Sequence, residues 1–168
     1  MKFITTSRLT LAAAGLASLL LAGTASADYR VTAFGETAEY SALLSKDVES
    51  AKSIFSKREI AKLDFISANN LCVTQILAKE FSEAISSCAT ALEKVDAELG
   101  IGVTTEKTAK ASILSNLAVA KAMNGDVSGA SMDLERALLL NSRDRNAVSN
   151  FNLISALPTV SADIAGNI

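Results

Sequence analysis

Two stretches of the chain repeat one pattern, and this repetition decides the expected fold. Residues 70–91 read NLCVTQILAKEFSEAISSCATA, and residues 116–137 read NLAVAKAMNGDVSGASMDLERA. Both begin with Asn-Leu, and both place alanine at matching offsets, at Ala84 and Ala130. Their apolar residues recur at helical spacing. Each stretch therefore predicts a pair of helices joined by a short turn.

The pattern extends beyond these two stretches. Three segments combine a polar turn, a large apolar residue and an alanine three positions later: KDVESA at 46–51, KEFSEA at 79–84 and GDVSGA at 125–130. The step from Ala51 to Ala84 and the step from Asn116 to Asn150 are both close to the period of about 34 residues that is typical of stacked helical hairpins. The steps from Ala84 to Ala130 and from Asn70 to Asn116 equal each other and are longer, which indicates one shared insertion of about 12 residues.

This spacing and these residues resemble the tetratricopeptide repeat (TPR) family over roughly residues 46–152. The family's packing positions are matched in two units, by Ala68, Leu71, Cys72, Ala84 and Cys88 and by Leu114, Leu117, Ala118, Ala130 and Leu134. Ala84 and Ala130 are small enough to let antiparallel helices approach closely, against Cys72 and Ala118. Strand signals are scarce, since no two alternating runs are joined by a hairpin turn. The expected fold is all-α, a short right-handed TPR-like solenoid of helical hairpins.

The chain also departs from the family pattern. Gln75 and Lys121 stand in place of the family's tyrosine, Cys88 and Leu134 replace its second-helix aromatic, and its terminal proline is absent from both units. In the insertion we expect a helix that ends near Leu99, a turn at two glycines, and a new helix capped by Thr104 or Thr105. Asp144 is expected to cap the last helix, which Pro158 should end.

Residues 1–27 are typical of a secretory signal peptide. A basic start is followed by an uncharged apolar run over 9–22 and by Ala25-Ser26-Ala27. The run is shorter than the roughly 20 residues of a membrane span, so a membrane anchor is the weaker interpretation. We expect cleavage after Ala27, an extended or partly ordered lead-in over 28–45, a helical domain over 46–157 and a frayed tail over 158–168. The mature chain is expected to be soluble, and either periplasmic in a Gram-negative cell or secreted.

Composition argues against several classes of function. Cleavage removes Lys2 and Arg8 from the 16 basic side chains, so 14 basic residues face 18 acidic ones and the net charge is −4. A nucleic-acid partner is not expected, because such affinity depends on clustered Lys and Arg. The chain has no histidine, which is the commonest general base. Carboxylates such as Glu80, Glu83 and Asp133 are interpreted as solvating charges, and neither catalysis nor a cofactor is expected.

The two cysteines, Cys72 and Cys88, are predicted to form a disulfide. They fall where the TPR resemblance implies that side chains of opposing helices face each other, and an even count in an exported chain favours pairing. Two buried thiols that fill core positions are the alternative interpretation. A metal site is not expected, because two cysteines without histidine fall short of four ligands.

The resemblance also implies a concave groove that takes up a protein or peptide partner. An asparagine before the family's leucine often binds a ligand backbone, and Asn70, Asn116 and Asn150 stand at that place. An amide carries both donors and an acceptor, although these residues could instead brace neighbouring helices. The apolar lining is expected to be Val73, Ile76, Val119 and Met123. Gripping of a terminal carboxylate is not expected, because Asn146 and Asn150 replace the Lys and Arg that it needs.

The sequence therefore predicts an exported protein–protein or peptide interaction module without catalytic activity. Two other classes stay open at this point. A small-ligand-binding protein would need an apolar pocket between the hairpins. A structural or stress-related envelope protein would associate with itself.

Overall fold

The computed structural model describes residues 28–157, and in this range the chain is all-helical, with no strand. The predicted signal peptide and the whole predicted tail, which includes Pro158, lie outside the described residues. None of the described helices is long and apolar enough to cross a membrane. In chain order the helices are α1 (Ala38–Leu44), α2 (Val48–Phe55), the 3-10 turn η1 (Ile60–Lys62), α3 (Phe65–Leu77), α4 (Phe81–Ala97), α5 (Val103–Met123), α6 (Val127–Leu140) and α7 (Arg145–Ser155).

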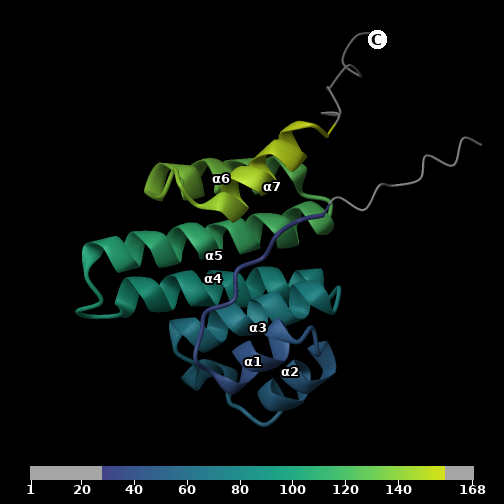
Figure 1. Ribbon diagram of the computed structural model, residues 1–168, viewed down its shortest axis with the longest axis vertical. Coiled ribbons are helices and arrows are strands. Elements are labelled where there is room, and N and C mark those ends of the chain that lie inside the picture. The colour runs from purple at the N-terminus through teal and green to yellow at the C-terminus, as the bar shows by residue number, and fades with distance from the viewer. Residues whose placement is uncertain (1–27, 158–168) are drawn as a thin grey trace, which may run out of the picture.

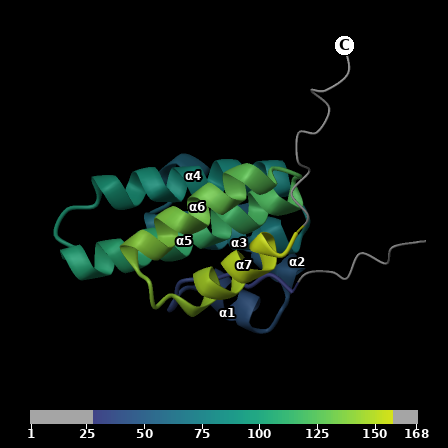
Figure 2. The ribbon, with the colours of Figure 1, turned by 90° about the horizontal axis from the view of Figure 1, so that it is seen from above.

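The helices pack in the order in which they follow one another along the chain. α1 contacts α2, α3 contacts α4, α4 contacts α5, α5 contacts α6, and α6 contacts α7 (Figure 1). α5 also contacts both α3 and α7. Seen from above, α4 and α6 lie on one side of the stack, away from the N-terminal segment, which runs on the side of α1 and α7 (Figure 2). One layer of helices, α3, α5 and α7, is thus available to that segment.

Local sequence explains where most helices begin. Asp47, Asp64, Asp126 and Asp144 each cap a helix by accepting a hydrogen bond from a backbone N–H of the first turn. The predicted cap at Asp144 is confirmed, since its Oδ1 accepts from the N–H groups of Asn146 and Ala147 at 3.0 Å each. Such caps satisfy amide groups that the helix itself leaves unpaired.

The structure adds a helix to one expected segment and corrects one expected cap. The lead-in, predicted to be extended or partly ordered over 28–45, contains a helix, because Ala38–Leu44 form α1, capped by Thr37 and packed on α2 and α3. In the insertion, α5 begins at Val103 with Gly102 as its N-cap residue, and not after Thr104 or Thr105. Gly102 has φ of 75°, which a glycine adopts without steric cost. It can therefore turn the chain directly into the helix, and no threonine cap is needed.

Buried alanines hold the hairpins close together. Ala84 is fully buried in a core cluster with Cys72, and Ala130 is fully buried in a second cluster with Ala118. A methyl group at these positions lets the two helix backbones approach, as close packing requires. The alanine pattern seen in the sequence therefore marks the contacts within each hairpin.

We expect Ala130→Leu to lower the free energy of unfolding by about 1–3 kcal/mol, because the added carbons have no space between α5 and α6. Urea unfolding followed by circular dichroism measures the change. Ala89→Leu is the matched control, since Ala89 is exposed on α4. Equal stability of the two variants would contradict the close contact at Ala130.

A disulfide joins the two helices of the central hairpin. Cys72 on α3 and Cys88 on α4 are bonded to each other, with their Cα atoms 5.2 Å apart. The predicted pairing is confirmed, and the alternative of two buried thiols is wrong. Both residues are fully buried within the first core cluster. The bond thus crosses the core at the point where α3 and α4 pack together.

Candidate functional site

An extended segment of the chain lies across the helical stack. Residues 28–34, which we call the strap, run over α7, α5 and α3 before the chain turns into α1 (Figure 1). The strap follows the order of the helices in reverse: its first residues lie at α7 and its last at α3. It occupies the face where the sequence predicts a groove for a partner.

Three buried asparagines bind the strap in one repeated arrangement, which we call the asparagine ladder. Each accepts the N–H of one strap residue through Oδ1 and donates through Nδ2 to the C=O of the same residue. All six donor–acceptor distances lie between 2.7 and 2.9 Å. The pairs are Asn150 with Arg30, Asn116 with Thr32, and Asn70 with Phe34.

The ladder reads the peptide backbone at every second residue. In an extended chain the N–H and C=O groups of alternate residues point the same way, so those of Arg30, Thr32 and Phe34 all face the helices. A primary amide supplies one acceptor and two donors, which matches the N–H and C=O of one residue. Recognition of this kind does not depend on the side chains of the bound segment.

Two of the ladder amides also brace the helices with their second donor. Asn116 donates through Nδ2 to Asn69 Oδ1 at 2.8 Å, which links α5 to α3. Asn150 donates to Ser115 Oγ at 3.0 Å, which links α7 to α5. All three ladder residues are 0% exposed. The two interpretations left open by the sequence, backbone binding and bracing, thus occur together, with the chain's own strap in the place of a partner.

Thr32 carries the most hydrogen bonds of the strap. Its C=O accepts from Asn116 and also from Asn69 Nδ2 at 2.9 Å, and its Oγ1 accepts from Asn146 Nδ2 at 2.8 Å. Asn146 lies in the first turn of α7, close to the ladder. The centre of the strap is therefore held from α3, α5 and α7 at once.

The strap also buries apolar surface. Tyr29, Val31 and Phe34 pack against the first core cluster, and Tyr29 contacts the second cluster as well. The ring of Phe34 meets that of Phe65 edge to face, with centroids 6.1 Å apart. Burial raises the pKa of Tyr29 above its ordinary value, because the charged phenolate would lose solvation. The strap is part of the packed structure as well as a hydrogen-bonded ligand.

The apolar residues predicted to line the groove have different roles. Val73 lines a shallow cavity of about 290 Å³ beside the strap. Val119 is 1% exposed and Ile76 is 7% exposed, and both belong to the first core cluster. Met123 is 44% exposed at the end of α5. Ile76 and Val119 therefore stabilise the hairpins and offer no surface to a partner, because both are buried in this cluster.

Asp133 is also placed differently from the expectation. The sequence predicts a solvating charge at this position, whereas the structure buries the residue to 3% exposure. Lys121 Nζ lies 2.6 Å from one of its carboxylate oxygens, and Arg136 Nη1 lies 3.1 Å from the other. A buried carboxylate needs such partners, since an unpaired buried charge is costly. Lys121 thus joins α5 to α6 through an ion pair.

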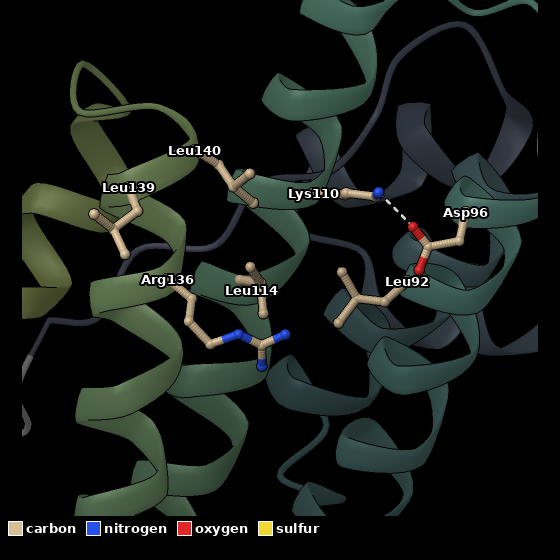
Figure 3. A pocket seen from close by; sticks show the side chains of 7 residues that line it. All are labelled: Leu92, Asp96, Lys110, Leu114, Arg136, Leu139 and Leu140. Atoms are coloured by element: carbon tan, nitrogen blue, oxygen red, sulfur yellow. Dashed lines mark ion pairs between the residues drawn. The ribbon is translucent and has the colours of Figure 1, made fainter.

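A second concave site lies between α4, α5 and α6. This cleft has a volume of about 370 Å³ (Figure 3). Its lining combines four leucines with a Lys110–Asp96 ion pair and the guanidinium of Arg136. Hydrogen bonds to Asp96 and Glu106 raise the pKa of Lys110, so its charge is compensated. The cleft is lined by Leu92, Asp96, Lys110, Leu114, Arg136, Leu139 and Leu140.

The strap could have been found in the sequence. Residues 29–33 read YRVTA, in which Tyr29, Val31 and Ala33 alternate with polar residues, and strict alternation is typical of an extended segment. The bracing residues carry a weaker signal, since Asn69 and Ser115 each directly precede a ladder asparagine. That the strap pairs with the ladder could not be read from these signals, because the two lie up to 120 residues apart.

Comparison with protein-family models, with curated proteins and with solved structures finds no match for this chain. Its functional interpretation therefore depends on the geometry of the strap and the ladder.

Proposed function

We propose that this chain is an exported interaction module, without catalytic activity, whose asparagine ladder holds an extended segment of a protein or peptide partner. The observation that carries the proposal is the strap itself. It is an extended peptide seated on the three amides through paired hydrogen bonds to its backbone. A partner segment of similar shape would find the same donors and acceptors once the strap has left.

The architecture supports this proposal. Successive helical hairpins, buried alanines at the repeat spacing and asparagines on α3, α5 and α7 are what a short right-handed TPR-like solenoid would have. In such a solenoid the helices that carry the asparagines would line the concave side. We assign the chain to this class of fold as part of the same proposal.

Export is proposed from two independent features. Residues 1–27 have the pattern of a signal peptide, and the Cys72–Cys88 disulfide is compatible with an oxidising compartment. We propose the periplasm of a Gram-negative cell, or the medium, as the location. Cleavage after Ala27 would place the new amino terminus at Asp28, shortly before Arg30, the first residue that the ladder binds.

A peptide-binding measurement tests the proposed function. We expect a labelled peptide of residues 28–37 to bind the Thr32→Pro chain at least tenfold more tightly than the natural chain. Proline removes the N–H that Asn116 accepts, so the strap is held less firmly. In the natural chain the tethered strap competes at a high effective concentration. Fluorescence anisotropy measures the two dissociation constants.

Two controls sharpen this experiment. Thr32→Val keeps the backbone N–H and removes only the hydroxyl, so this chain should bind the peptide less well than Thr32→Pro does. A peptide that itself carries the Thr32→Pro change should bind every chain poorly. Absence of binding of the natural peptide to the Thr32→Pro chain, with circular dichroism showing a folded protein, would refute the proposal.

The cleft of Figure 3 supports a second candidate function, the binding of a small amphipathic ligand. Its four leucines offer apolar surface, and Arg136 and Lys110 offer charge. Both cations already have carboxylate partners, Asp133 for Arg136 and Asp96 for Lys110, which makes an anionic ligand a weaker candidate. A thermal-shift screen of uncharged long-chain alcohols and of peptides separates the two functions, since only the stabilisation by alcohols should be sensitive to Leu139→Asn, at an exposed residue of the cleft.

A further inference from the structure

The connection between the strap and the helical body is very short. Phe34 is bound by Asn70, and Thr37 caps α1 and also accepts a hydrogen bond from Asn70. Only Gly35 and Glu36 lie between these two fixed points. Glu36 has φ of 68°, in the left-handed region, which residues with a Cβ adopt at an energetic cost. The strap therefore reaches its own ladder through a hinge that is both short and strained.

All contacts of the strap are non-covalent, and most of the polar ones involve its backbone. The ladder binds the N–H and C=O groups of Arg30, Thr32 and Phe34, and the first core cluster packs against the side chains of Tyr29 and Val31. The same groups would be met by residues 28–34 of another molecule. The strap would make the same contacts whether it belongs to the same molecule or to another one. These two arrangements would differ in the conformation of the hinge and in the entropy of association.

We propose that the asparagine ladder of one molecule accepts the strap of a second copy, in a reciprocal exchange that forms a two-fold symmetric dimer. Short, strained hinges favour such exchange, because an extended hinge releases the strain. Residues 28–34 are the occupant whose fit to the ladder the structure shows. The proposal rests on the proposed function, since both require that the ladder accept an extended segment from another molecule.

Substitution of the hinge residue tests the exchange. Proline cannot adopt the positive φ of Glu36, so Glu36→Pro should prevent the strap from folding back onto its own ladder. We expect Glu36→Pro to be dimeric at micromolar concentration in size-exclusion chromatography with light scattering. Glu36→Gly is the matched control: glycine takes a positive φ freely, and relief of strain in the closed monomer should weaken the dimer at least tenfold relative to the natural chain. A monomeric Glu36→Pro chain would overturn the proposal.

A double variant shows whether the dimer uses the ladder. Adding Thr32→Pro to Glu36→Pro removes the N–H that Asn116 accepts in each half of the dimer, and should raise the dissociation constant at least tenfold. An unchanged dimer would mean that the molecules associate elsewhere, which overturns the exchange. If Glu36→Pro does not fold, the natural chain and Glu36→Gly are refolded at high concentration and compared; equal dimer fractions overturn the proposal.

The exchange and the proposed function can fail separately. If labelled peptide 28–37 binds the Thr32→Pro chain but Glu36→Pro stays monomeric, the ladder accepts a peptide and the exchange is wrong. If the peptide does not bind and Glu36→Pro is monomeric, both are wrong. A dimeric Glu36→Pro chain that is weakened by Thr32→Pro supports the exchange.

Discussion

Asn116→Asp is expected to lower the free energy of unfolding by roughly 3–5 kcal/mol at neutral pH, the cost of an unpaired buried charge. Asn116 is fully buried, and its Nδ2 donates to Thr32 O and to Asn69 Oδ1. A carboxylate has no hydrogen-bond donor. Thr32 O and Asn69 Oδ1 would therefore lose the donor that they now share and would lie next to a negative charge. The position carries both the strap and the link between α5 and α3, so the substitution should loosen both.

The effect of Asn116→Asp should depend on pH in a defined direction. Burial raises the pKa of the introduced carboxyl above its unfolded value of about 3.9. The folded state then binds the proton more tightly than the unfolded state does. The loss of unfolding free energy caused by the substitution is therefore smallest below a pH of about 3.9, and it grows as the pH rises through the folded-state pKa. Urea unfolding of the variant and of the natural chain at acidic and neutral pH measures it.

Asn152→Asp provides the matched control for this prediction. Asn152 is exposed on α7, and exposed substitutions usually change stability by under about 0.5 kcal/mol. If Asn116→Asp were no more destabilising than Asn152→Asp at neutral pH, the amide would not be holding the strap and the helices together as the geometry indicates.

Loss of the disulfide is expected to cost about 3 kcal/mol of unfolding free energy, through the double variant Cys72→Ala, Cys88→Ala. The bond closes a loop with a sequence separation of 16 residues, and a loop of that size restricts the unfolded chain by about this amount. Both side chains are buried in the first core cluster, so the loss of two sulfur atoms adds a packing penalty. Thermal unfolding should shift down by roughly 10 °C.

Reduction provides the control for the disulfide prediction. Dithiothreitol should lower the unfolding temperature of the natural chain toward that of the double variant and leave the double variant unchanged. An unfolding temperature of the natural chain that does not respond to reductant, with free thiols confirmed by mass spectrometry, would show that the bond does not contribute to stability.

Local signals in the sequence located most of the helical body. The helical period, the buried alanines and the cap at Asp144 depend on residues that lie close together in the chain, so their spacing alone predicts them. The insertion was harder. Thr104 and Thr105 carry hydroxyl groups that can cap a helix, but α5 already begins at Val103, with Gly102 as its N-cap residue. The positive φ of Gly102 turns the chain into the helix before either threonine is reached.

Only part of the candidate site could be predicted from the sequence. Asn70, Asn116 and Asn150 could be singled out because an amide complements a peptide backbone whatever the bound side chains are. Val119 could not be distinguished from a surface residue, because an apolar side chain on a helix looks the same whether it faces a groove or a core. Its burial in the first core cluster follows from how α5 packs against α3 and α4.

Periodicity, residue size and the presence of two cysteines were sufficient to predict that the chain is helical, where its hairpins pack and which cysteines pair. What the asparagines bind could be established only from the folded chain. Their partners, Arg30, Thr32 and Phe34, are 36 to 120 residues away, and they offer backbone groups that every residue other than proline carries. Contacts to backbone groups do not constrain which residue type occupies a position. They could therefore be identified only in the folded chain, where the strap lies across the ladder.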